Sequence, residues 1–225
     1  VMGMDLLHGG HLTHGSPANR SGKLYNIVSY GIDPKTERID YDAVEELAQR
    51  NKPRMIIAGY TSYPWTPDWH RFRQIADSVG AYLLADISHI AGMVAAGTVS
   101  SPVGHAHVIS FTTHKTLYGP RGACILTLDK QLARRVDSAV FPGEQGGPHC
   151  NAMAGMAVAF ELATSPEFAQ LQHQVVENAK MLAAELEGHG FRIPYGGTDT
   201  HMLLVDCKSV RSGHGASPDG KRGTP

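Results

Sequence analysis

The chain has 225 residues, of which 20 are basic and 21 acidic, so its net charge at pH 7 is −1. With 42% hydrophobic and 18% charged residues, this composition excludes a disordered segment, a polybasic nucleic-acid binder and an acidic solvating tail. The sequence also lacks an apolar run of roughly 18 residues and a basic-then-apolar leader, which predicts a soluble protein that crosses no membrane. Cys124, Cys150 and Cys207 are too scattered for a disulfide framework or a paired-cysteine zinc site, so we expect a reducing cytoplasm.

The first half of the chain alternates helical and strand patterns. A short amphipathic helix is predicted to begin at a capping box of Asp42 and Glu45 and to be stopped by Pro53, and Thr66-Pro67 opens a second helix. Four short apolar runs predict strands covered on both faces: Met55–Ala58, Ala81–Ala85, Val108–Phe111 and Ala123–Leu126. This rhythm predicts an α/β fold, a three-layer α/β/α sandwich around a mainly parallel sheet.

Two further helices follow the predicted sheet. Residues 151–163 are small and apolar on nearly all sides, which predicts a buried helix, and residues 165–188 predict a longer amphipathic one. Residues 201–206 then predict a strand. We therefore expect a large domain over residues 1–190 and the start of a smaller domain over residues 191–225, ending in a Gly/Ser-rich tail.

Polar side chains follow three of the predicted strands: Thr61-Ser62-Tyr63, Asp86 with Ser88 and His89, and Thr112-Thr113-His114-Lys115. Open α/β sheets bind ligands at the carboxyl ends of their strands. A carboxylate and a lysine that reach one edge from separate strands could form a structural ion pair. The surroundings of Lys115 favour chemistry instead, because hydroxyl groups and a histidine flank it and the turn Gly119–Gly122 follows it.

An Asp and a Lys at one sheet edge are what pyridoxal phosphate (PLP) chemistry requires. The lysine amine condenses with the cofactor aldehyde, and burial can lower the pKa of a lysine, unlike that of an arginine, into the nucleophilic range. An ionised Asp keeps the pyridine nitrogen protonated, so that the ring accepts electrons from a substrate carbanion. The residues thus predict a PLP-dependent enzyme with Lys115 and Asp86 as its central pair.

Five motifs resemble those of serine hydroxymethyltransferases, in that family's order. The most specific is Thr112–Gly122, which resembles the family's PLP-lysine motif, and the others are His8–Pro17, Asp86–Gly92, Ala139–Pro148 and Gly196–Asp199. The resemblance extends over residues 3–206. It implies the large domain of the fold type I PLP-dependent transferases.

The resemblance also implies roles for single residues around the cofactor. Lys115 would bind the PLP aldehyde and Asp86 the pyridine nitrogen, in agreement with the reasoning from the residues alone. His89 and Thr61 would hydrogen-bond the phenolic oxygen, and His11 would stack on the ring face.

Gly146 and Gly147 correspond to family positions whose backbone N–H groups bind the PLP phosphate in the neighbouring subunit's site. The resemblance therefore implies a homodimer or a homotetramer. A tight turn before the following helix would also explain these two glycines.

Other positions match contacts to tetrahydrofolate, the co-substrate that the resemblance implies beside serine and glycine. These positions are Leu6, Gly10, His11 and Leu12, and core packing alone would also explain the two leucines. His114, next to the lysine, matches a position linked to reaction specificity.

A zinc site formed by His8, His11 and His14 is a competing interpretation, since three histidines at three-residue intervals could face one way on a helix. The glycines around them argue against a helix, and no Cys or carboxylate nearby completes a tetrahedral set. We therefore expect no metal site.

The resemblance implies transfer of the serine hydroxymethyl group to tetrahydrofolate, giving glycine and 5,10-methylenetetrahydrofolate, with Lys115, His114, Asp86 and His11 as the catalytic set. The family's N-terminal arm, its Ser-Gly-Ser phosphate loop and its carboxylate-binding arginine have no counterpart in these residues, so we expect an internal fragment. Two alternatives stay open: another fold type I PLP lyase, similar to threonine aldolase, and a catalytically inactive fragment or scaffold.

Overall fold

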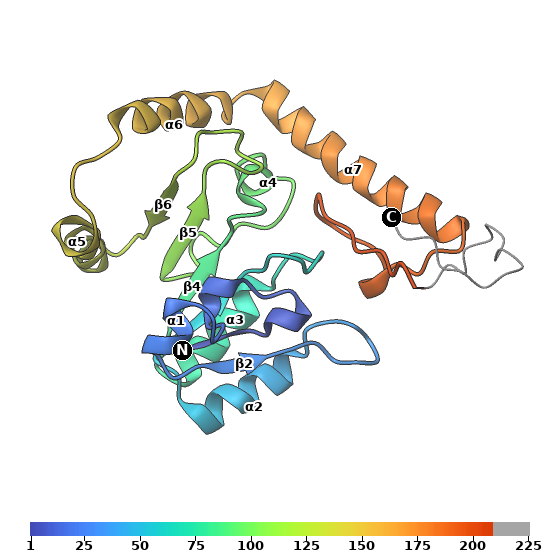
Figure 1. Ribbon diagram of the computed structural model, residues 1–225, viewed down its shortest axis with the longest axis horizontal. Coiled ribbons are helices and arrows are strands. Elements are labelled where there is room, and N and C mark those ends of the chain that lie inside the picture. The colour runs from blue at the N-terminus through green and yellow to red at the C-terminus, as the bar shows by residue number, and fades with distance from the viewer. Residues whose placement is uncertain (209–225) are drawn as a thin grey trace, which may run out of the picture.

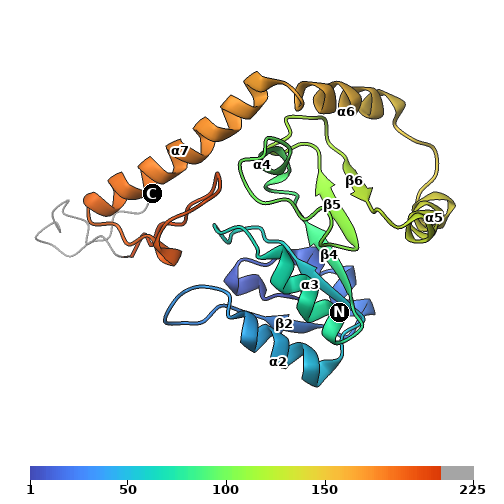
Figure 2. The same cartoon turned by 180° about the vertical axis from the view of Figure 1, so that it is seen from behind.

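The computed structural model describes residues 1–208, which form a six-stranded sheet of order β2-β1-β3-β4-β5-β6 (Figures 1 and 2). Its strands are β1 Met2–Met4, β2 Val28–Tyr30, β3 Met55–Ala58, β4 Tyr82–Asp86, β5 Val108–Thr112 and β6 Ala123–Leu126. Strands β1 to β5 run parallel, and β6 pairs antiparallel with β5 at one edge. The predicted mainly parallel α/β fold is confirmed.

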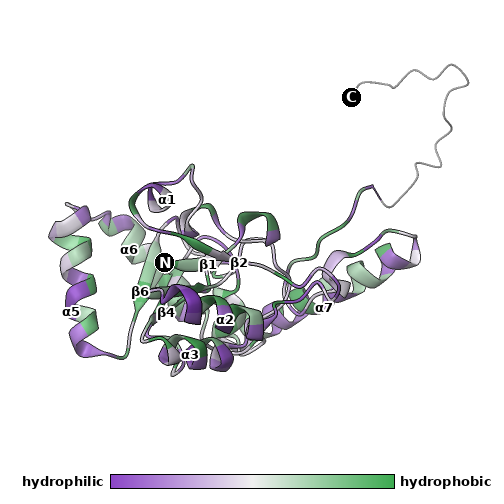
Figure 3. Ribbon diagram, turned by 90° about the horizontal axis from the view of Figure 1, so that it is seen from below, coloured by the Kyte–Doolittle hydropathy of each residue, from purple (hydrophilic) through white to green (hydrophobic). Residues whose placement is uncertain are grey.

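Helices flank this sheet. They are α1 Arg20–Leu24, α2 Tyr41–Asn51, α3 Trp69–Ser78, α4 Ala91–Ala95, α5 Lys130–Ser138, α6 Cys150–Leu162 and α7 Pro166–Gly188, with short turns η1 Leu6–His8, η2 Leu12–His14, η3 Ala139–Glu144 and η4 Pro194–Gly196. Helices α2 and α3 pack on each other and on one face of the sheet, whereas α1 lies on the opposite side (Figure 3). Helices thus lie on both sides of the sheet, but they do not cover it fully, because Tyr82 of β4 is 42% exposed.

The core lies between the sheet and α3. Met2, Ile56, Phe72, Ile75 and Leu83 are each 0% exposed. Burial of a side chain of this size contributes about 1.5–3 kcal/mol to folding. Strands β1 and β2 were not predicted from the sequence, because each has only three residues, too few to show a strand's alternation of apolar and polar side chains.

The predicted starts of two helices were wrong by a few residues. Asp40 caps α2, since its carboxylate accepts hydrogen bonds from the backbone N–H groups of Asp42 and Ala43. Helix α3 begins after Asp68, which accepts from the Arg71 N–H. An aspartate at the N-cap satisfies backbone donors that the first turn leaves free. In both helices the true N-cap lies two residues from the predicted one, Asp42 in α2 and Thr66 in α3.

The long helix α7 confirms its prediction, with Ser165 as its cap and Pro166 in its first turn. Helix α6 contradicts the expected burial, because only Ala159 in it is buried and Val158 and Leu162 are each 60% exposed. Figures 1 and 2 show α6 and α7 as an arm beyond β5 and β6. Helix α6 touches the turn after Lys115 through Gly155 and Ala159, and its Phe160 ring meets Phe111 of β5. Most of its remaining surface is exposed within the described chain.

Strand β6 and the segment after α7 also differ from prediction. Ile125 and Leu126 in β6 are 45% and 50% exposed, so this strand is not covered on both faces. Residues 201–206 form no strand, and Asp206 makes an isolated bridge to Arg192. Within residues 1–208, no helix has the length and apolar character needed to cross a membrane. The tail after Ser209 lies outside the described residues, and the division at residue 190 stays a prediction.

Candidate active site

Three parallel strands deliver the predicted site residues to one edge of the sheet. Strand β4 ends at Asp86, which lies in register with Ser110 of β5, and Lys115 follows the end of β5. Thr61 follows β3, the other neighbour of β4. Gly59 lets these ends approach, because a Cβ at this position would collide with the Asp86 backbone. The carboxyl ends of the strands therefore meet where a ligand site is expected.

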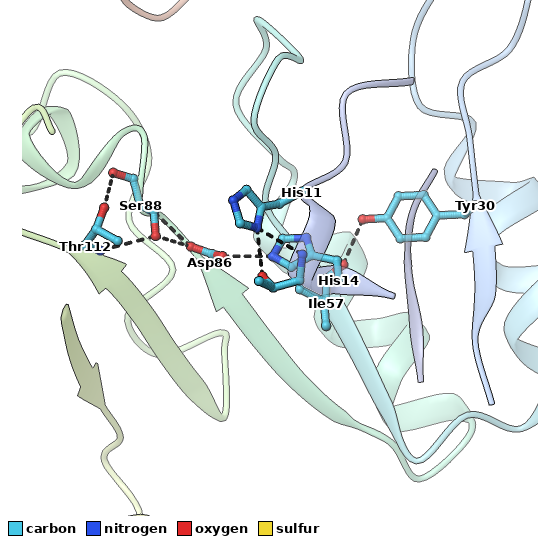
Figure 4. Close-up of polar contacts among 8 residues, drawn as sticks. His11, His14, Tyr30, Ile57, Asp86, Ser88 and Thr112 are labelled. Atoms are coloured by element: carbon cyan, nitrogen blue, oxygen red, sulfur yellow. Dashed lines mark hydrogen bonds and ion pairs between the residues drawn. The ribbon is translucent and has the colours of Figure 1, made fainter. Parts of the chain in front are cut away.

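A chain of hydrogen bonds crosses this edge and fixes the Asp86 carboxylate (Figure 4). His14 Nε2 donates to Asp86 Oδ2 over 2.9 Å. Ser88 donates to Asp86 Oδ1 from its hydroxyl over 2.5 Å and from its backbone N–H over 3.0 Å. The Ser88 hydroxyl in turn accepts from the Thr112 N–H over 3.2 Å. Three residues, from η2, from β5 and from the β4–α4 loop, thus hold one carboxylate in place.

These contacts keep Asp86 ionised. Burial raises the pKa of this carboxyl, but the hydrogen bonds from His14 and Ser88 outweigh that effect and lower the pKa to about 2. Hydrogen bonds donated to a carboxylate favour its charged form. At neutral pH, Asp86 therefore carries a negative charge at a partly buried position, where its side chain is 20% exposed.

The loop that carries Lys115 is anchored on both sides. Thr113 donates its hydroxyl proton to the Pro120 carbonyl over 2.6 Å and its N–H to the Gly122 carbonyl over 3.0 Å. Thr116 donates to the His89 carbonyl, and its own carbonyl accepts from Gln172 on α7. The backbone around Lys115 is therefore held while its side chain remains partly accessible.

Lys115 forms no ion pair with Asp86, whose ionic contact is with His14. The structural ion pair considered from the sequence is therefore not present. Burial lowers the pKa of the Lys115 amine, and the Asp86 charge opposes that effect. Lys115 and Asp86 thus lie close enough to interact electrostatically, and the amine loses its proton more readily than an exposed lysine does.

The predicted imidazoles gather around this pair. The pKa of His11 is lowered by burial first and then by His14 and Lys115, whereas Asp86 raises it. Burial, followed by Lys115, lowers the pKa of His89 to about 4. Thr61 contributes a hydroxyl oxygen that is buried and has no hydrogen-bond partner. The structure therefore brings Lys115, Asp86, His11 and His89 together and places Thr61 at the same edge.

Three other predicted residues are not part of this cluster. Gly146 and Gly147 lie in an exposed stretch after η3, and a Cβ at either position would meet nothing within 4 Å. Contacts within the described chain thus do not explain why glycine is needed there. His114 lies beside Lys115 in the sequence, and its Nδ1 is buried without a hydrogen-bond partner in the described chain.

The positions predicted to contact tetrahydrofolate lie between β1 and the cluster. Leu6 and Leu12 are 45% and 49% exposed, so core packing does not explain them. Gly10 is buried against the Met4 carbonyl, where a Cβ would not fit. Packing of the chain thus explains why glycine occupies this position. It lets the chain fold back and place His11 at the site.

The zinc interpretation of the three N-terminal histidines gains no support. His14 is bonded to Asp86, and the His8 ring lies against Gly31. Among residues 1–208, no group of three or more His, Cys, Asp or Glu side chains has the arrangement of a metal site.

Sequence reasoning assigned no role at the site to His14, Ser88 or His201. The position of Ser88 two residues after Asp86 was a usable signal, since an Asp side chain often accepts a hydrogen bond from the backbone N–H two residues on. His14 was considered only as a zinc ligand. The ring of His201 stacks on His89, and no local pattern connects it with residues so distant in the sequence.

A model of the family named serine hydroxymethyltransferase matches residues 1–219. The chain belongs to this family. The serine hydroxymethyltransferases of Synechococcus sp. (strain JA-3-3Ab) and Nostoc punctiforme are 57% and 55% identical to it over 210 residues, or 93% of this chain. Those matches cover 48% and 49% of the two relatives, so the chain spans about half their length. The resemblance seen in the motifs is confirmed.

The donor set of this family member fits the ring and aldehyde of PLP, the cofactor that the family resemblance implies. Asp86 is an ionised carboxylate suited to a protonated pyridine nitrogen, and Lys115 is an amine with a lowered pKa. The buried Thr61 hydroxyl has no hydrogen-bond partner in the described chain, and an oxygen atom of a ligand can provide one. A buried polar group of this kind is costly unless a ligand or water satisfies it.

Proposed function

We propose that this chain carries the PLP site of an enzyme that transfers the hydroxymethyl group of serine to tetrahydrofolate, giving glycine and 5,10-methylenetetrahydrofolate. The observation that carries the proposal is the Asp86 carboxylate, held ionised by His14 and Ser88 at the strand edge to which Lys115 belongs. An ion pair that served only folding would join Asp86 to Lys115. Here the carboxylate is held by other groups and the amine is left unpaired.

PLP, when bound, supplies an aldehyde that captures amines and a ring that accepts electrons from the bond being broken. Lys115 provides the amine for that aldehyde, because burial favours its unprotonated, nucleophilic form. Asp86 holds a proton on the ring nitrogen, because it stays ionised and its position is fixed by two neighbours.

The imidazoles orient the cofactor and leave its charge unchanged. His89, with its pKa lowered to about 4, is neutral at pH 7 and so donates or accepts one hydrogen bond without adding a charge. Thr61 offers its unpartnered hydroxyl from β3, and we assign the phenolic oxygen to these two groups. His11 supplies a flat ring that stacks on the heterocycle.

We assign tetrahydrofolate to the loop between β1 and His11. Leu6 and Leu12 expose apolar surface there, which can take an aromatic ring system. We also assign a role in reaction specificity to His114, whose buried Nδ1 has no partner in the described chain.

The phosphate of PLP needs donors that the cluster does not contain, and we assign them to Gly146 and Gly147 of a second copy of the chain. Open space surrounds both glycines, and backbone N–H groups in such a segment suit an anion. The enzyme would then be a homodimer or a homotetramer. We place it in the cytoplasm, in agreement with its three free cysteines, Cys124, Cys150 and Cys207.

An absorbance titration with PLP tests the proposal. The chain should develop visible absorbance near neutral pH, Lys115→Ala should not, and Lys35→Ala, an exposed lysine in a loop, should behave like the unsubstituted chain. Asp86→Asn should bind PLP but lose roughly 100- to 1,000-fold in turnover, because a neutral amide stabilises the ring nitrogen poorly. Visible absorbance retained in Lys115→Ala would refute the role of Lys115.

Addition of serine with and without tetrahydrofolate separates the proposed reaction from its alternatives. Acceleration of serine cleavage by tetrahydrofolate supports hydroxymethyl transfer. Cleavage that tetrahydrofolate does not accelerate indicates a lyase similar to threonine aldolase, and absence of any coloured complex indicates an inactive scaffold.

A further inference from the structure

The segment after α7 returns to the strand edge and is fastened there (Figure 1). The hydroxyl groups of Thr198 and Thr200 donate to the Pro64 carbonyl over 3.1 and 3.2 Å. Asp199 accepts a hydrogen bond from the Thr66 N–H over 2.8 Å. Thr198 and Thr200 are 5% and 2% exposed. The residue that follows this buried anchor, His201, is therefore held against the loop that follows β3.

His201 stacks on His89. The centroids of the two rings are 6.0 Å apart, and their planes differ by 17°. The Nδ1 atom of His201 is buried, and it has no hydrogen-bond partner within the described chain. Since the backbone before His201 is anchored and the two rings are nearly parallel, the plane of His89 is restricted from one side by another ring.

The charged and titratable groups around His89 favour a neutral stack. Burial lowers the pKa of His89 most, Lys115 and His201 lower it further, Asp86 raises it, and His11 lowers it. Burial and then Lys115 lower the pKa of His201 as well. Two stacked imidazolium ions next to an ammonium group would repel one another, so both rings are most stable without a second proton.

We propose that His201 is a positioning residue of the candidate active site, which holds the His89 imidazole in one plane and in its uncharged form. This inference rests on the proposed function for its purpose, since His89 is the group assigned to the phenolic oxygen of PLP. A freely rotating imidazole would hold that oxygen less well. His201 acts through His89, from a segment far away in the sequence, and its effect is therefore on orientation and protonation.

Side-chain NMR of the chain without PLP tests this role. In the unsubstituted chain, His89 should titrate near pH 4, and the pKa of His201 should lie below 6.5, the usual value for histidine. The variant His201→Ala removes the stack and part of the burial, so the pKa of His89 should rise by about one unit or more. The variant His201→Phe keeps a flat ring and should leave the pKa of His89 low. His173→Ala, an exposed imidazole on α7, is the matched control and should change neither value.

PLP affinity gives a second readout. His201→Ala should weaken PLP binding by about tenfold, and His201→Phe should restore most of that loss, because the position of His89 depends on the ring and not on its nitrogens. If His89 or His201 titrates near pH 6.5 in the unsubstituted chain, or if His201→Ala leaves the His89 pKa unchanged, the proposal is wrong. The titration needs no cofactor, so its failure leaves the role of Lys115 standing, and absence of PLP binding leaves the stack untouched.

Discussion

Strands β3 and β4 and strand β6 have similar apolar sequences and opposite environments. Leu83 in β4 is 0% exposed, whereas Leu126 in β6 is 50% exposed. In the first region, α3 packs on β3 and β4 and α2 packs on α3, so one face of these strands is covered (Figure 3). Beside β6 lies an apolar groove of about 470 Å³ lined by Phe111, Leu126 and Phe160. An apolar run therefore predicts a strand, but the rest of the fold decides whether it is buried.

The comparison also distinguishes a site whose contacts all lie within this chain from a surface that we expect a second polypeptide to cover. The strand edge with Asp86, Lys115 and the histidines lies where the sheet is covered, and its contacts are internal. The groove and the exposed face of α6 lie where the sheet is bare, and Gly146 and Gly147 precede α6 in the chain. We expect the second region to be the one that a further polypeptide covers, which agrees with an oligomer in which those glycines serve a second site.

The largest expected difference between the two regions comes from a matched pair of leucine-to-alanine substitutions, one in β4 and one in β6. Leu83→Ala should lower the free energy of unfolding by about 2–5 kcal/mol, because it leaves a cavity in a closed core. Leu126→Ala should lower it by less than about 1 kcal/mol, because half of that side chain is already in water. Chemical denaturation of both variants measures the difference, and equal losses would show that β6 is as well covered as β4.

The pH dependence of stability tests the hydrogen bonds around Asp86 at the candidate active site. The folded pKa of Asp86 is about 2, below its usual 3.8, so its contribution to stability is complete above about pH 4 and is lost as pH falls toward 2. The size of this shift corresponds to about 2 kcal/mol. Asp86→Asn should therefore differ from the unsubstituted chain most above pH 4 and least near pH 2. Ser88→Ala, which removes one of the hydrogen bonds to Asp86, should show a smaller difference of the same sign, and parallel pH profiles would contradict the account.

The smallest effect is expected on the exposed arm. Val158→Lys on α6, where the side chain is 60% exposed, should change the free energy of unfolding by less than about 0.5 kcal/mol. It should nevertheless reduce self-association, because it places a charge on the apolar face assigned to a partner. Sedimentation at several concentrations checks this, with Lys180→Ala on α7 as a surface control. A large loss of stability without a change in association would show that α6 belongs to the core.

The sequence predicted most of the sheet and the central pair, for reasons that particular residues show. Met55–Ala58 is a continuous apolar run between Pro53 and Gly59, and these two neighbours mark its ends in the sequence itself. Asp86 and Lys115 each follow such a run, so strand direction alone brings them to one edge. The exposure of α6 in this chain was not predictable, since a helix that is apolar on all sides indicates a partner without identifying it.

The residues that fix Asp86 and His89 needed the three-dimensional structure. His14 reaches Asp86 only because Gly10 lets the chain after β1 fold back onto the sheet. His201 reaches His89 only because Pro64 anchors the segment after α7. Each contact joins distant parts of the chain, and no periodicity or spacing carries that information.

The central claim is that the amine of Lys115 captures a PLP aldehyde at the edge where Asp86 is held ionised. Borohydride reduction of the chain mixed with PLP, followed by peptide mapping, tests it most directly. The account predicts a covalent PLP label on Lys115 in the unsubstituted chain and its loss from that peptide in Lys115→Ala. A label spread over exposed lysines such as Lys35, with Lys115 unmodified, would contradict it.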